Sequence, residues 1–239
     1  MLRIDATLKS TAEHLAQDES LLLQAEEAAS PQEYCRVWEA TALAVVLGSS
    51  SHWQTEANVA NCQADTVPIL RRPSGGAAIL AGPGCLMYAV VLSLELRPQL
   101  HAIEQIHRFV LERLVGALDR IAPGVSRAGT SDLVYLGQKF SGNALRCKRR
   151  HVLYHGTLLY DFPLAKIEQY LGTPPRQPDY RQGRSHGDFV RNLPVNRPEL
   201  ENAIFAAFDV TGVSSNLPTS RVQQLLSERY LLPEWNQRI

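Results

Sequence analysis

The sequence lacks an excess of either charge. Its 239 residues contain 24 Lys and Arg and 24 Asp and Glu, so the formal net charge is zero at neutral pH. Nucleic-acid-binding domains usually carry a basic surplus, so no nucleic-acid partner is expected. Apolar residues make up 45% of the chain, the balance of an ordinary globular protein that buries a large core. The predicted organisation is a single domain over residues 1–239.

Long hydrophobic segments are also missing. The longest apolar run, Leu86 to Leu92, falls far short of the roughly 18 residues that cross a bilayer. Residues 1–7 lack the basic and then apolar profile of a signal peptide. The four cysteines lie far apart and form no Cys-x-x-Cys pair: Cys35, Cys62, Cys85 and Cys147. This spacing favours reduced thiols over a disulfide framework or a zinc site. We therefore expect a cytoplasmic protein without a membrane partner.

The spacing of apolar residues predicts helices and strands in irregular alternation. Glycine and proline mark the ends of several of these segments. Helices are expected over 8–28, 103–121, 199–210 and 220–231, and strands over 43–47, 67–70, 86–94, 133–136, 139–145 and 152–160. Gly137-Gln138 is expected to form a tight hairpin turn. Residues 172–197 predict a long surface loop of the kind that is often functional. Without a repeated βαβ order, the pattern favours an α+β or mixed-sheet fold.

A Gly-rich segment, Arg71-Arg72-Pro73-Ser74-Gly75-Gly76-Ala77, follows one predicted strand. Its glycines let the backbone approach a ligand and turn N–H groups towards an anion. The adjacent guanidinium groups suit phosphate or carboxylate. On these residues alone, a solvated surface turn carries equal weight.

Two further segments contain isolated polar side chains in predicted strands. Lys139 is flanked by Phe140 and by small residues, so its ammonium group can point into a pocket and neutralise charge on a carboxyl or phosphate oxygen. An outward-pointing lysine is the commoner arrangement. His155 lies in an apolar strand, where a hydrogen-bonded core residue is the usual role, and Gly156 indicates a close approach of backbone or ligand.

A cationic run, Arg146-Cys147-Lys148-Arg149-Arg150-His151, separates the last two predicted strands. A solvated turn is the simpler interpretation, and contact with nucleotide phosphate or with an acidic partner protein is the alternative. The neighbouring charges favour a lowered pKa for Cys147.

The order of these segments resembles the catalytic domain of lipoate–protein ligases. The matching motifs are Arg-Arg-x-Ser-Gly-Gly, Ser-Asp-Leu, Lys-x-Ser-Gly-Asn-Ala and His-Gly-Thr-Leu-Leu, and the resemblance covers residues 12–165. It implies an α+β fold with a mixed, largely antiparallel sheet flanked by helices, shared with biotin ligases and octanoyltransferases. It further implies ATP and magnesium as co-substrates, without a tightly bound cofactor. Lipoate would become lipoyl-AMP, and the lipoyl group would pass to a lysine of a lipoyl carrier domain, in a 2-oxoacid dehydrogenase acyltransferase subunit or the glycine-cleavage H protein.

By the same resemblance, Lys139 is the catalytic residue that binds the acyl carbonyl and phosphate oxygens. Asp132 is expected near the nucleotide or its metal ion. The other residues expected at the lipoyl-adenylate pocket are Arg72, Ser74, Gly75, Gly76, Ser141, Gly142, Ala144, His155, Gly156 and Thr157. The 172–197 loop, with Arg176, Arg181, Arg184 and Arg191, is expected to order over the adenylate or to receive the carrier. The 239 residues leave no room for the C-terminal accessory domain of two-domain ligases, which implies a single-domain form with an accessory-domain protein as a further partner.

Three alternatives stay open. An octanoyl or lipoyl transferase of the same fold needs a thiolate, and residues 124–130, where that cysteine would stand, contain none. Cys147 could serve only from an unfamiliar position. Biotin ligation is disfavoured because the Gly-Arg-Gly-Arg loop is absent. Departures from the ligase motifs at Ala77, Ala81-Gly82 and Ser131 favour a non-catalytic lipoyl-binding relative, whereas Lys139 favours an enzyme.

Overall fold

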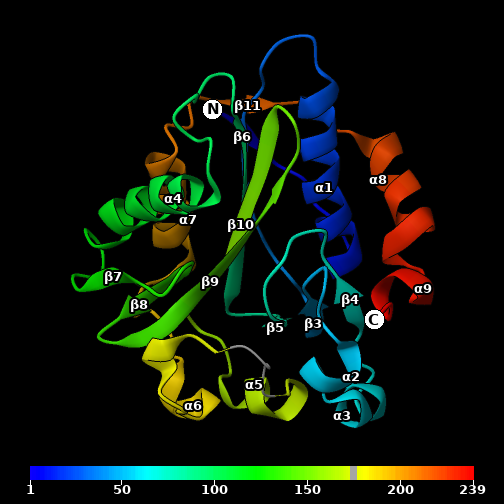
Figure 1. Ribbon diagram of the computed structural model, residues 1–239, viewed down its shortest axis with the longest axis vertical. Helices are drawn as coiled ribbons and strands as arrows, with labels where there is room; N and C mark the ends of the chain where they lie inside the picture. Colours follow the sequence, from blue (N-terminus) through cyan, green and yellow to red (C-terminus); the bar gives the residue numbers. More distant parts are fainter. Residues whose placement is uncertain (173–176) are drawn as a thin grey trace.

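Strands and helices alternate along the chain in the computed structural model, which describes residues 1–172 and 177–239 (Figure 1). The strands are β1 (Leu2–Ile4), β2 (Tyr34–Glu39), β3 (Ala44–Leu47), β4 (Ile69–Arg71), β5 (Ile79–Ala81), β6 (Cys85–Ser93), β7 (Val125–Ala128), β8 (Asp132–Tyr135), β9 (Gln138–Cys147), β10 (His151–Leu159) and β11 (Gly212–Ser214). The helices are α1 (Thr11–Glu27), α2 (Trp53–Glu56), α3 (Val59–Ala64), α4 (Ile103–Leu118), α5 (Ala165–Tyr170), α6 (His186–Phe189), α7 (Arg197–Ala207), α8 (Thr219–Leu225) and α9 (Pro233–Asn236), with a 3-10 turn η1 (Asp179–Arg181) and a π-helical turn η2 (Leu226–Tyr230).

Two sheets form the framework of the protein. Within the described ranges, the larger sheet has eight strands in the order β11-β1-β2-β6-β10-β9-β8-β7, and the smaller has three in the order β4-β3-β5. Neighbouring strands from β2 through β7 run antiparallel, whereas β1 runs parallel to both β2 and β11. In the smaller sheet β3 is parallel to β4 and antiparallel to β5. The predicted α+β fold with a mixed, largely antiparallel sheet is confirmed.

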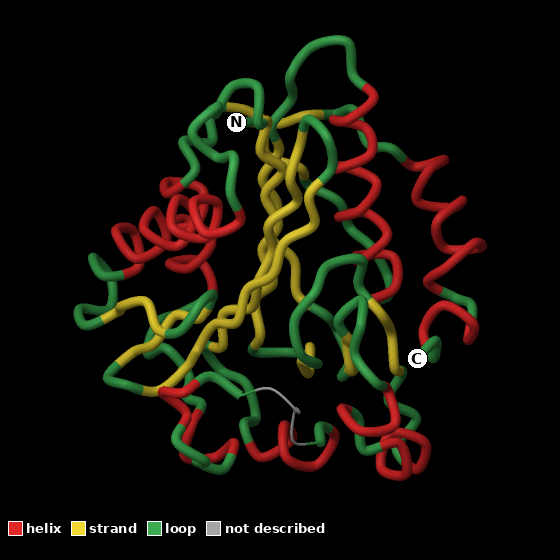
Figure 2. The backbone as a smooth tube through the Cα atoms, in the orientation of Figure 1, coloured by secondary structure: helices red, strands yellow, loops and turns green. Residues whose placement is uncertain are grey.

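Helices cover both faces of the large sheet because its central strands alternate apolar side chains between the two faces. On β6, Tyr88 and Val90 pack in one cluster with the buried face of α4 and α7. Met87 lies in a second cluster with Leu15 of α1 and the strand residues of the smaller sheet. Figures 1 and 2 show α4 and α7 on one side of the strands and α1 on the other. The face towards α1 and the smaller sheet holds the candidate site.

Helix α1 begins at a capping box, in which the Ser10 hydroxyl accepts from the Glu13 amide and the Glu13 carboxylate accepts from the Ser10 amide. The helix is buried on most of its circumference because the large sheet covers one side and α8 and η2 cover another. Two buried carboxylates on α1 are therefore paired: Asp18 with Arg36 of β2, and Glu19 with Arg229 and Tyr230 of η2.

Several element boundaries differ from the prediction. The hairpin turn between β8 and β9 is Leu136-Gly137 rather than Gly137-Gln138, because Tyr135 pairs with Gln138 and both turn residues have positive φ. The strand predicted at 67–70 lies at Ile69–Arg71. The 172–197 segment contains the helical turns η1 and α6 in its described part. The helix predicted over 220–231 ends at Leu225 and continues as η2.

The lengths of the helices and the state of the cysteines bear on two expectations from the sequence. None of the helices in the described part of the chain is both long and apolar enough to cross a membrane. All four cysteines are free thiols, three of them buried, as the spacing predicted.

Candidate functional site

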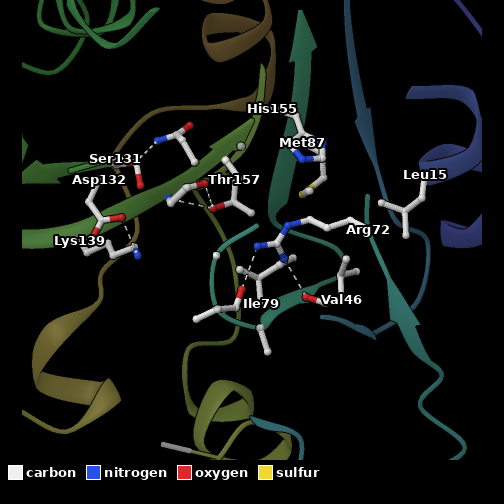
Figure 3. Close-up of a pocket in the computed structure, with 17 residues that line it drawn as sticks. Leu15, Val46, Arg72, Ile79, Met87, Ser131, Asp132, Lys139, His155 and Thr157 are labelled. Atoms are coloured by element: carbon white, nitrogen blue, oxygen red, sulfur yellow. Dashed lines mark hydrogen bonds and ion pairs between the residues drawn. The ribbon is translucent and has the colours of Figure 1, made fainter. Parts of the chain in front are cut away.

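A pocket opens between strands β9 and β10 and the Gly-rich segment that follows β4 (Figure 3). We call it the Lys139 pocket. It is lined by Leu15, Val46, Arg72, Gly76, Ala77, Ala78, Ile79, Met87, Ser131, Asp132, Lys139, Gly142, Asn143, Ala144, His155, Gly156 and Thr157. Its polar side chains come from β8, β9 and β10, from the loop before β8 and, through Arg72, from the Gly-rich segment. Much of its apolar wall comes from α1, β3, β5 and β6.

Strand alternation explains which side chains reach this pocket. On β10, Tyr154 and Leu158 join the core under α4 and α7, so His155 and Thr157 point to the opposite face. On β9, Phe140 joins the same core, and Lys139 lies on the pocket side. The pairing of β8 with β9 shifts register between Leu133 and Val134, and Val134 is the residue that pairs with Lys139. The lysine is therefore directed inward, against the commoner outward arrangement.

Lys139 forms an ion pair at the mouth of the pocket. Its ammonium nitrogen lies 2.8 Å from Oδ1 of Asp132, and the Tyr180 hydroxyl donates to Oδ2 of the same carboxylate at 2.7 Å. The lysine side chain retains 28% exposure, whereas that of Asp132 retains 11%. Burial and the neighbouring Asp132 carboxylate raise the pKa of Tyr180, which keeps its hydroxyl protonated as a donor. The ammonium group is thus held in place yet accessible to a ligand.

Two glycines let the strands and Lys139 pack closely. A Cβ at Gly142 would stand 3.0 Å from the Lys139 ammonium nitrogen. A Cβ at Gly156 would lie 1.9 Å from Oδ1 of Asn143, whose side chain fills that space and accepts from the Tyr88 hydroxyl. These contacts explain why small residues are required here and support the close approach predicted at Gly156.

Arg72 organises the Gly-rich segment from within. It is buried, and its guanidinium donates to the Ser74 hydroxyl and to the carbonyls of Val46, Gly75 and Ala77. Burial lowers the pKa of Arg72 to about 10, so the group stays charged at neutral pH. Gly76 adopts φ +90°, a conformation that favours glycine. The Gly-rich segment is therefore an ordered loop held by hydrogen bonds from the buried Arg72 guanidinium.

Ser74 and His155 are in direct contact behind the pocket wall. The Ser74 oxygen lies 2.5 Å from Nε2 of His155, and Nδ1 of the same ring faces the Asp18 carboxylate at 3.8 Å. All three side chains are buried. His155 therefore combines both roles weighed from the sequence, because it is a partnered core residue that also lines the pocket.

Arg71 does not contribute charge to the site, so the expectation of two adjacent ligand-facing arginines is wrong. Its side chain is fully buried and donates to backbone carbonyls of Gly48, Ser51, Trp235, Asn236 and Arg238. Arg71 is the last residue of β4 and its side chain is fixed by these carbonyls, whereas Arg72, the first residue after the strand, lines the pocket. Arg71 instead joins the C-terminal residues to the loop after β3.

A second pocket adjoins the first and shares part of its lining. We call it the adjoining pocket, and it is lined by Ala77, Ala78, Ile79, Leu80, Lys139, Phe140, Ser141, Gly142, Thr157, Leu159, Ile167, Leu171, Pro178, Arg181, His186, Phe189 and Val190. Lys139 and Thr157 line both pockets. The lysine thus stands where the two cavities meet.

The structure brings most of the predicted site residues together. Those that line the Lys139 pocket are Arg72, Gly76, Asp132, Lys139, Gly142, Ala144, His155, Gly156 and Thr157, and Ser141 lines the adjoining pocket. Ser74 and Gly75 lie outside both linings and contact Arg72. The sequence reading missed the apolar wall, formed by Leu15, Val46, Ile79 and Met87, because such residues cannot be distinguished from ordinary core positions.

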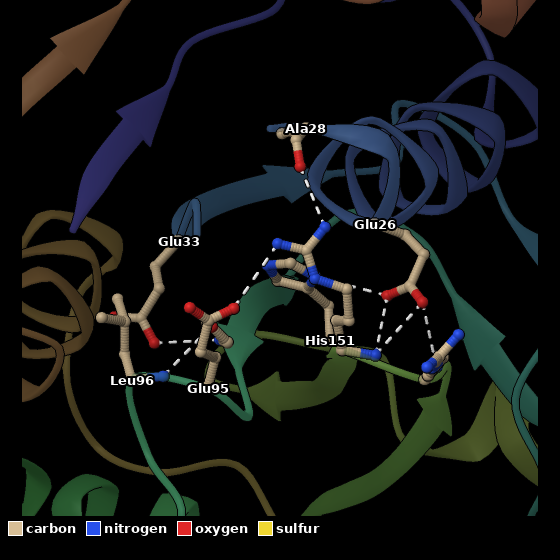
Figure 4. Close-up of polar contacts among 9 residues, drawn as sticks. Glu26, Ala28, Glu33, Glu95, Leu96 and His151 are labelled. Atoms are coloured by element: carbon tan, nitrogen blue, oxygen red, sulfur yellow. Dashed lines mark hydrogen bonds and ion pairs between the residues drawn. The ribbon is translucent and has the colours of Figure 1, made fainter. Parts of the chain in front are cut away.

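The cationic run occupies the opposite end of the β9–β10 hairpin. Glu26 of α1 accepts from the Arg149 and Arg150 amides and lies 3.3 Å from Nδ1 of His151 (Figure 4). Cys147 is eight residues along β9 from Lys139, roughly 26 Å at the usual strand rise. The run therefore lies far from both pockets, and its position gives no support to the alternative that it contacts a nucleotide. Partial burial raises the pKa of Cys147, contrary to the lowered pKa expected from its neighbours.

The arginines of the 172–197 segment have different surroundings. Arg176 lies outside the described residues. Arg181 lines the adjoining pocket, Arg184 donates to the Tyr180 carbonyl, and Arg191 stacks over the Tyr135 ring. The described part of this segment packs against Lys139, since the Arg191 amide donates to the Lys139 carbonyl at 2.9 Å. Its predicted response to ligand or carrier stays a prediction.

Metal ligation by the chain alone is not supported. In residues 1–172 and 177–239, no three His, Cys, Asp or Glu side chains gather in a way that could hold a metal ion. Asp132 is a single carboxylate at the pocket. Mg²⁺ commonly binds through one or two carboxylates together with substrate phosphates, so Asp132 fits only a metal ion that arrives with a nucleotide.

Comparison with known proteins identifies the family. Residues 10–208 match the family model described as lipoyl protein ligase A/B catalytic domain. Lipoate-protein ligase A of Psychrobacter cryohalolentis is 27% identical over 169 residues, which cover 69% of this chain and 48% of that protein. The chain spans about half the length of the curated relatives it matches.

Solved structures share the fold. A structure from work on the bipartite lipoate protein ligase and its E2 lipoyl domain of Thermoplasma acidophilum gives a TM-score of 0.82 at 20% identity. The match covers 99% of this chain and 95% of that chain. A lipoate-protein ligase A bound with ATP gives a TM-score of 0.80 at 20% identity, with coverage of 99% and 98%. Because the family model matches residues 10–208, which are most of the chain, the chain belongs to the lipoyl protein ligase A/B catalytic domain family.

Proposed function

We propose that this protein activates lipoate, or a similar medium-chain acid, with ATP to form an acyl-AMP and transfers the acyl group to a lysine of a carrier domain. The observation that carries the proposal is the position of Lys139 where the two pockets meet. An acyl-AMP has an anionic phosphate between an acyl chain and a nucleoside. A single ammonium group between two cavities matches that charge distribution.

The two cavities suit the two halves of such a molecule. The end of the Lys139 pocket away from Lys139 is lined by Leu15, Val46 and Met87, which fit an aliphatic chain (Figure 3). The adjoining pocket has an apolar wall with Arg181 and His186 at its edge, which fits a nucleotide base and its phosphates. We therefore place the acyl chain in the Lys139 pocket and the nucleotide in the adjoining pocket.

The proposed reaction has two steps. A carboxylate oxygen of the acid attacks the α-phosphorus of ATP, and pyrophosphate leaves. The ε-amine of the carrier lysine then attacks the acyl carbonyl, AMP leaves, and the amine loses a proton. Negative charge develops on the phosphate in the first step and on the carbonyl oxygen in the second. Lys139 neutralises both as its ammonium group moves from Asp132 towards the ligand.

Magnesium would accompany ATP. When bound, it would neutralise phosphate charge and orient the leaving pyrophosphate. Asp132 is the carboxylate placed to contribute, because it lies beside Lys139 at the pocket. Tyr180 fixes the direction of that carboxylate through its hydrogen bond.

The proposed carrier is a lipoyl domain, because an E2 lipoyl domain is named alongside the structurally similar archaeal ligase. The alternative is an octanoyl or lipoyl transferase of the same fold, which would use a cysteine to hold the acyl group as a thioester. All four cysteines are described, and none lines either pocket. A covalent thioester route therefore lacks a nucleophile at the site. A separate accessory-domain protein stays a proposal that the carrier assay tests.

The test is to incubate the pure protein with lipoate, ATP and Mg²⁺ and to measure lipoyl-AMP by mass spectrometry. A lipoyl domain is then added and its mass is followed. Lipoyl-AMP followed by a lipoylated domain is the expected result. Lipoyl-AMP without transfer would indicate that a partner such as an accessory-domain protein is needed. Acylation from octanoyl-carrier protein without ATP, in the absence of lipoyl-AMP, would overturn the ligase proposal in favour of the transferase.

A further inference from the structure

A chain of buried polar groups runs from α1 to the Gly-rich segment. Arg36 donates to Oδ1 of Asp18 at 2.5 Å, and the Trp38 indole donates to Oδ2 at 3.3 Å. Oδ2 also faces Nδ1 of His155 at 3.8 Å, and Nε2 of that ring contacts Ser74. Ser74 in turn accepts from Nε of Arg72. The chain ends at the guanidinium that organises the pocket loop.

For a neutral His155 ring, the donors and acceptors in this chain permit one consistent direction. An ionised Asp18 attracts the ring proton of His155 to Nδ1, which leaves Nε2 as an acceptor for the Ser74 hydroxyl. The Ser74 oxygen is then free to accept from Arg72. Burial alone would raise the pKa of Asp18, but Arg36 and the contact with His155 outweigh it and lower the pKa, so Asp18 is ionised.

This arrangement changes what the histidine presents to a ligand. Both ring nitrogens of His155 are directed to protein groups, although the ring lines the pocket beside Met87 (Figure 3). Four of the five N–H groups of Arg72 are also used by the protein. The part of the pocket farthest from Lys139 therefore meets a ligand with ring carbons and aliphatic groups, despite its polar composition.

We propose that Asp18 is a specificity-determining positioning residue: by fixing His155 in its Nδ1–H form against Ser74, it makes the distal pocket effectively apolar and excludes acids with a polar tail. The inference rests on the proposed function, since it assumes that the acyl chain occupies the Lys139 pocket. A pocket whose polar groups are nearly all paired with the protein gives a ligand hydroxyl no good partner and thereby disfavours it.

The test measures kcat/KM for adenylation of octanoate and of 8-hydroxyoctanoate, each with ATP and Mg²⁺. The quantity compared is the specificity ratio, which is kcat/KM for octanoate divided by kcat/KM for 8-hydroxyoctanoate. The wild-type ratio is expected to be about 100, the usual cost of adding a hydroxyl group to an apolar pocket. Asp18→Asn removes the carboxylate and releases the Nδ1 proton, and Ser74→Ala releases Nε2. Each variant is expected to lower the ratio by about tenfold, mainly through a lower KM for the hydroxy acid.

Glu19→Gln is the matched control. Glu19 is the next residue of α1, equally buried, and it pairs with Arg229 and Tyr230 instead of the chain to the pocket. Replacing Glu19 removes one buried carboxylate without touching His155. The ratio of kcat/KM for octanoate to that for 8-hydroxyoctanoate in Glu19→Gln should therefore equal the wild-type ratio. If Asp18→Asn does not fold, Ser74→Ala decides. An unchanged ratio in every folded variant would overturn the proposal.

A spectroscopic measurement separates this inference from the proposed function. Long-range ¹H–¹⁵N correlation spectra report which ring nitrogen of a histidine carries the proton. The Nδ1–H form of His155 is expected in the wild type and its loss in Asp18→Asn. An Nε2–H form or a doubly protonated ring in the wild type would overturn the inference, even if adenylation proceeds. Absence of adenylation with either acid, together with the expected spectrum, would instead count against the proposed function.

Discussion

Lys139 is the residue whose environment bears most directly on the chemistry. It is paired with Asp132 at 2.8 Å, yet it remains partly exposed where the two pockets meet. An ion pair at a partly exposed position contributes little to stability. The lysine can therefore exchange Asp132 for a ligand phosphate at low cost, which is the behaviour expected of a binding cation.

Replacing this lysine tests the role directly. Lys139→Ala is expected to lower kcat/KM for acyl-AMP formation by at least about 100-fold, since a preorganised charge at a developing anion is worth several kcal/mol. The unfolding free energy should change by less than about 1 kcal/mol. Lys148→Ala, on the exposed end of the hairpin, is the control. Near-normal adenylation by the Lys139 variant would contradict its catalytic role.

Gly142 controls the position of the same ammonium group. In Gly142→Ala the new methyl would stand 3.0 Å from Nζ and 3.1 Å from Cε of Lys139. Because those atoms end a flexible side chain, the protein should fold, while adenylation falls by about tenfold as the ammonium group is displaced. Steady-state adenylation and thermal unfolding measure the two effects.

Gly116→Ala provides the comparison for this substitution. Gly116 is an exposed residue of α4, and a Cβ there meets nothing within 4 Å. Its replacement should raise the unfolding free energy by about 0.5–1 kcal/mol without changing activity, because alanine is the better helix former. Equal activity of the two glycine variants would show that Gly142 does not position Lys139.

For single residues, the ordered motifs identified side chains that the structure gathers around the two pockets, whereas contacts made only in the tertiary structure could not be predicted. Arg71 and Arg72 are adjacent and chemically identical, yet one organises the pocket loop and the other binds the C-terminal backbone. Asp18 was indistinguishable from an exposed helical carboxylate, because its partner Arg36 lies on a strand that the pattern did not predict.

Among the elements, the β8–β9 hairpin has a turn residue, Leu136, in an unfavourable backbone conformation. Its turn residues are Leu136 at φ 49° and Gly137 at φ 79°, a combination typical of a type I′ turn, which favours Asn-Gly. A leucine in the left-handed region costs roughly 1–2 kcal/mol, and the Leu136 side chain is largely exposed.

Leu136→Asn should therefore stabilise the hairpin. We expect the unfolding free energy to rise by about 1 kcal/mol in urea denaturation, with adenylation unchanged. Leu136→Val should act in the opposite direction, because a β-branched residue tolerates positive φ poorly. Equal stability of the two variants would mean that the turn conformation is not limiting.

Long periodic elements were predictable, whereas short ones were not. Helices α1 and α4 lie within three residues of their predicted limits because their apolar spacing extends over several turns. Strands such as β1 and β11, with three residues each, carry too few side chains for a pattern. Strand β2 was missed because it contains a buried charged residue, Arg36, which interrupts the apolar pattern. The Arg36 side chain is buried because it pairs with Asp18 of α1.

Across the whole molecule, buried ionisable groups make stability depend on pH. His14 of α1 stacks on Trp38 with ring centroids 4.4 Å apart, and its Nδ1 lies 2.9 Å from the Arg36 guanidinium. Burial, reinforced by the charge of Arg36, lowers the pKa of His14 from 6.5 to about 4. The ring is thus neutral in the folded protein at pH values where it is charged in the unfolded chain.

The direction of the pH effect follows from this difference. Between pH 6.5 and 4 the unfolded state binds more protons than the folded state, so acidification favours unfolding. The contribution of His14 is fully present above pH 6.5 and is lost as the pH falls through about 4. A shift of this size corresponds to a contribution on the order of 3 kcal/mol. His107 shifts in the same direction because it is also buried.

Urea denaturation at several pH values between 4 and 7 measures the effect. The wild type should lose stability steadily across this range, and His14→Gln should lose less, because glutamine cannot take up the proton that drives unfolding. The variant will be less stable at pH 7, since the stacking on Trp38 is reduced, so its curve should approach that of the wild type only at low pH. His101→Gln, at an exposed position, should follow the wild-type curve. Parallel curves for the wild type and His14→Gln would contradict a neutral, buried His14 and would remove the largest named source of acid sensitivity from this fold.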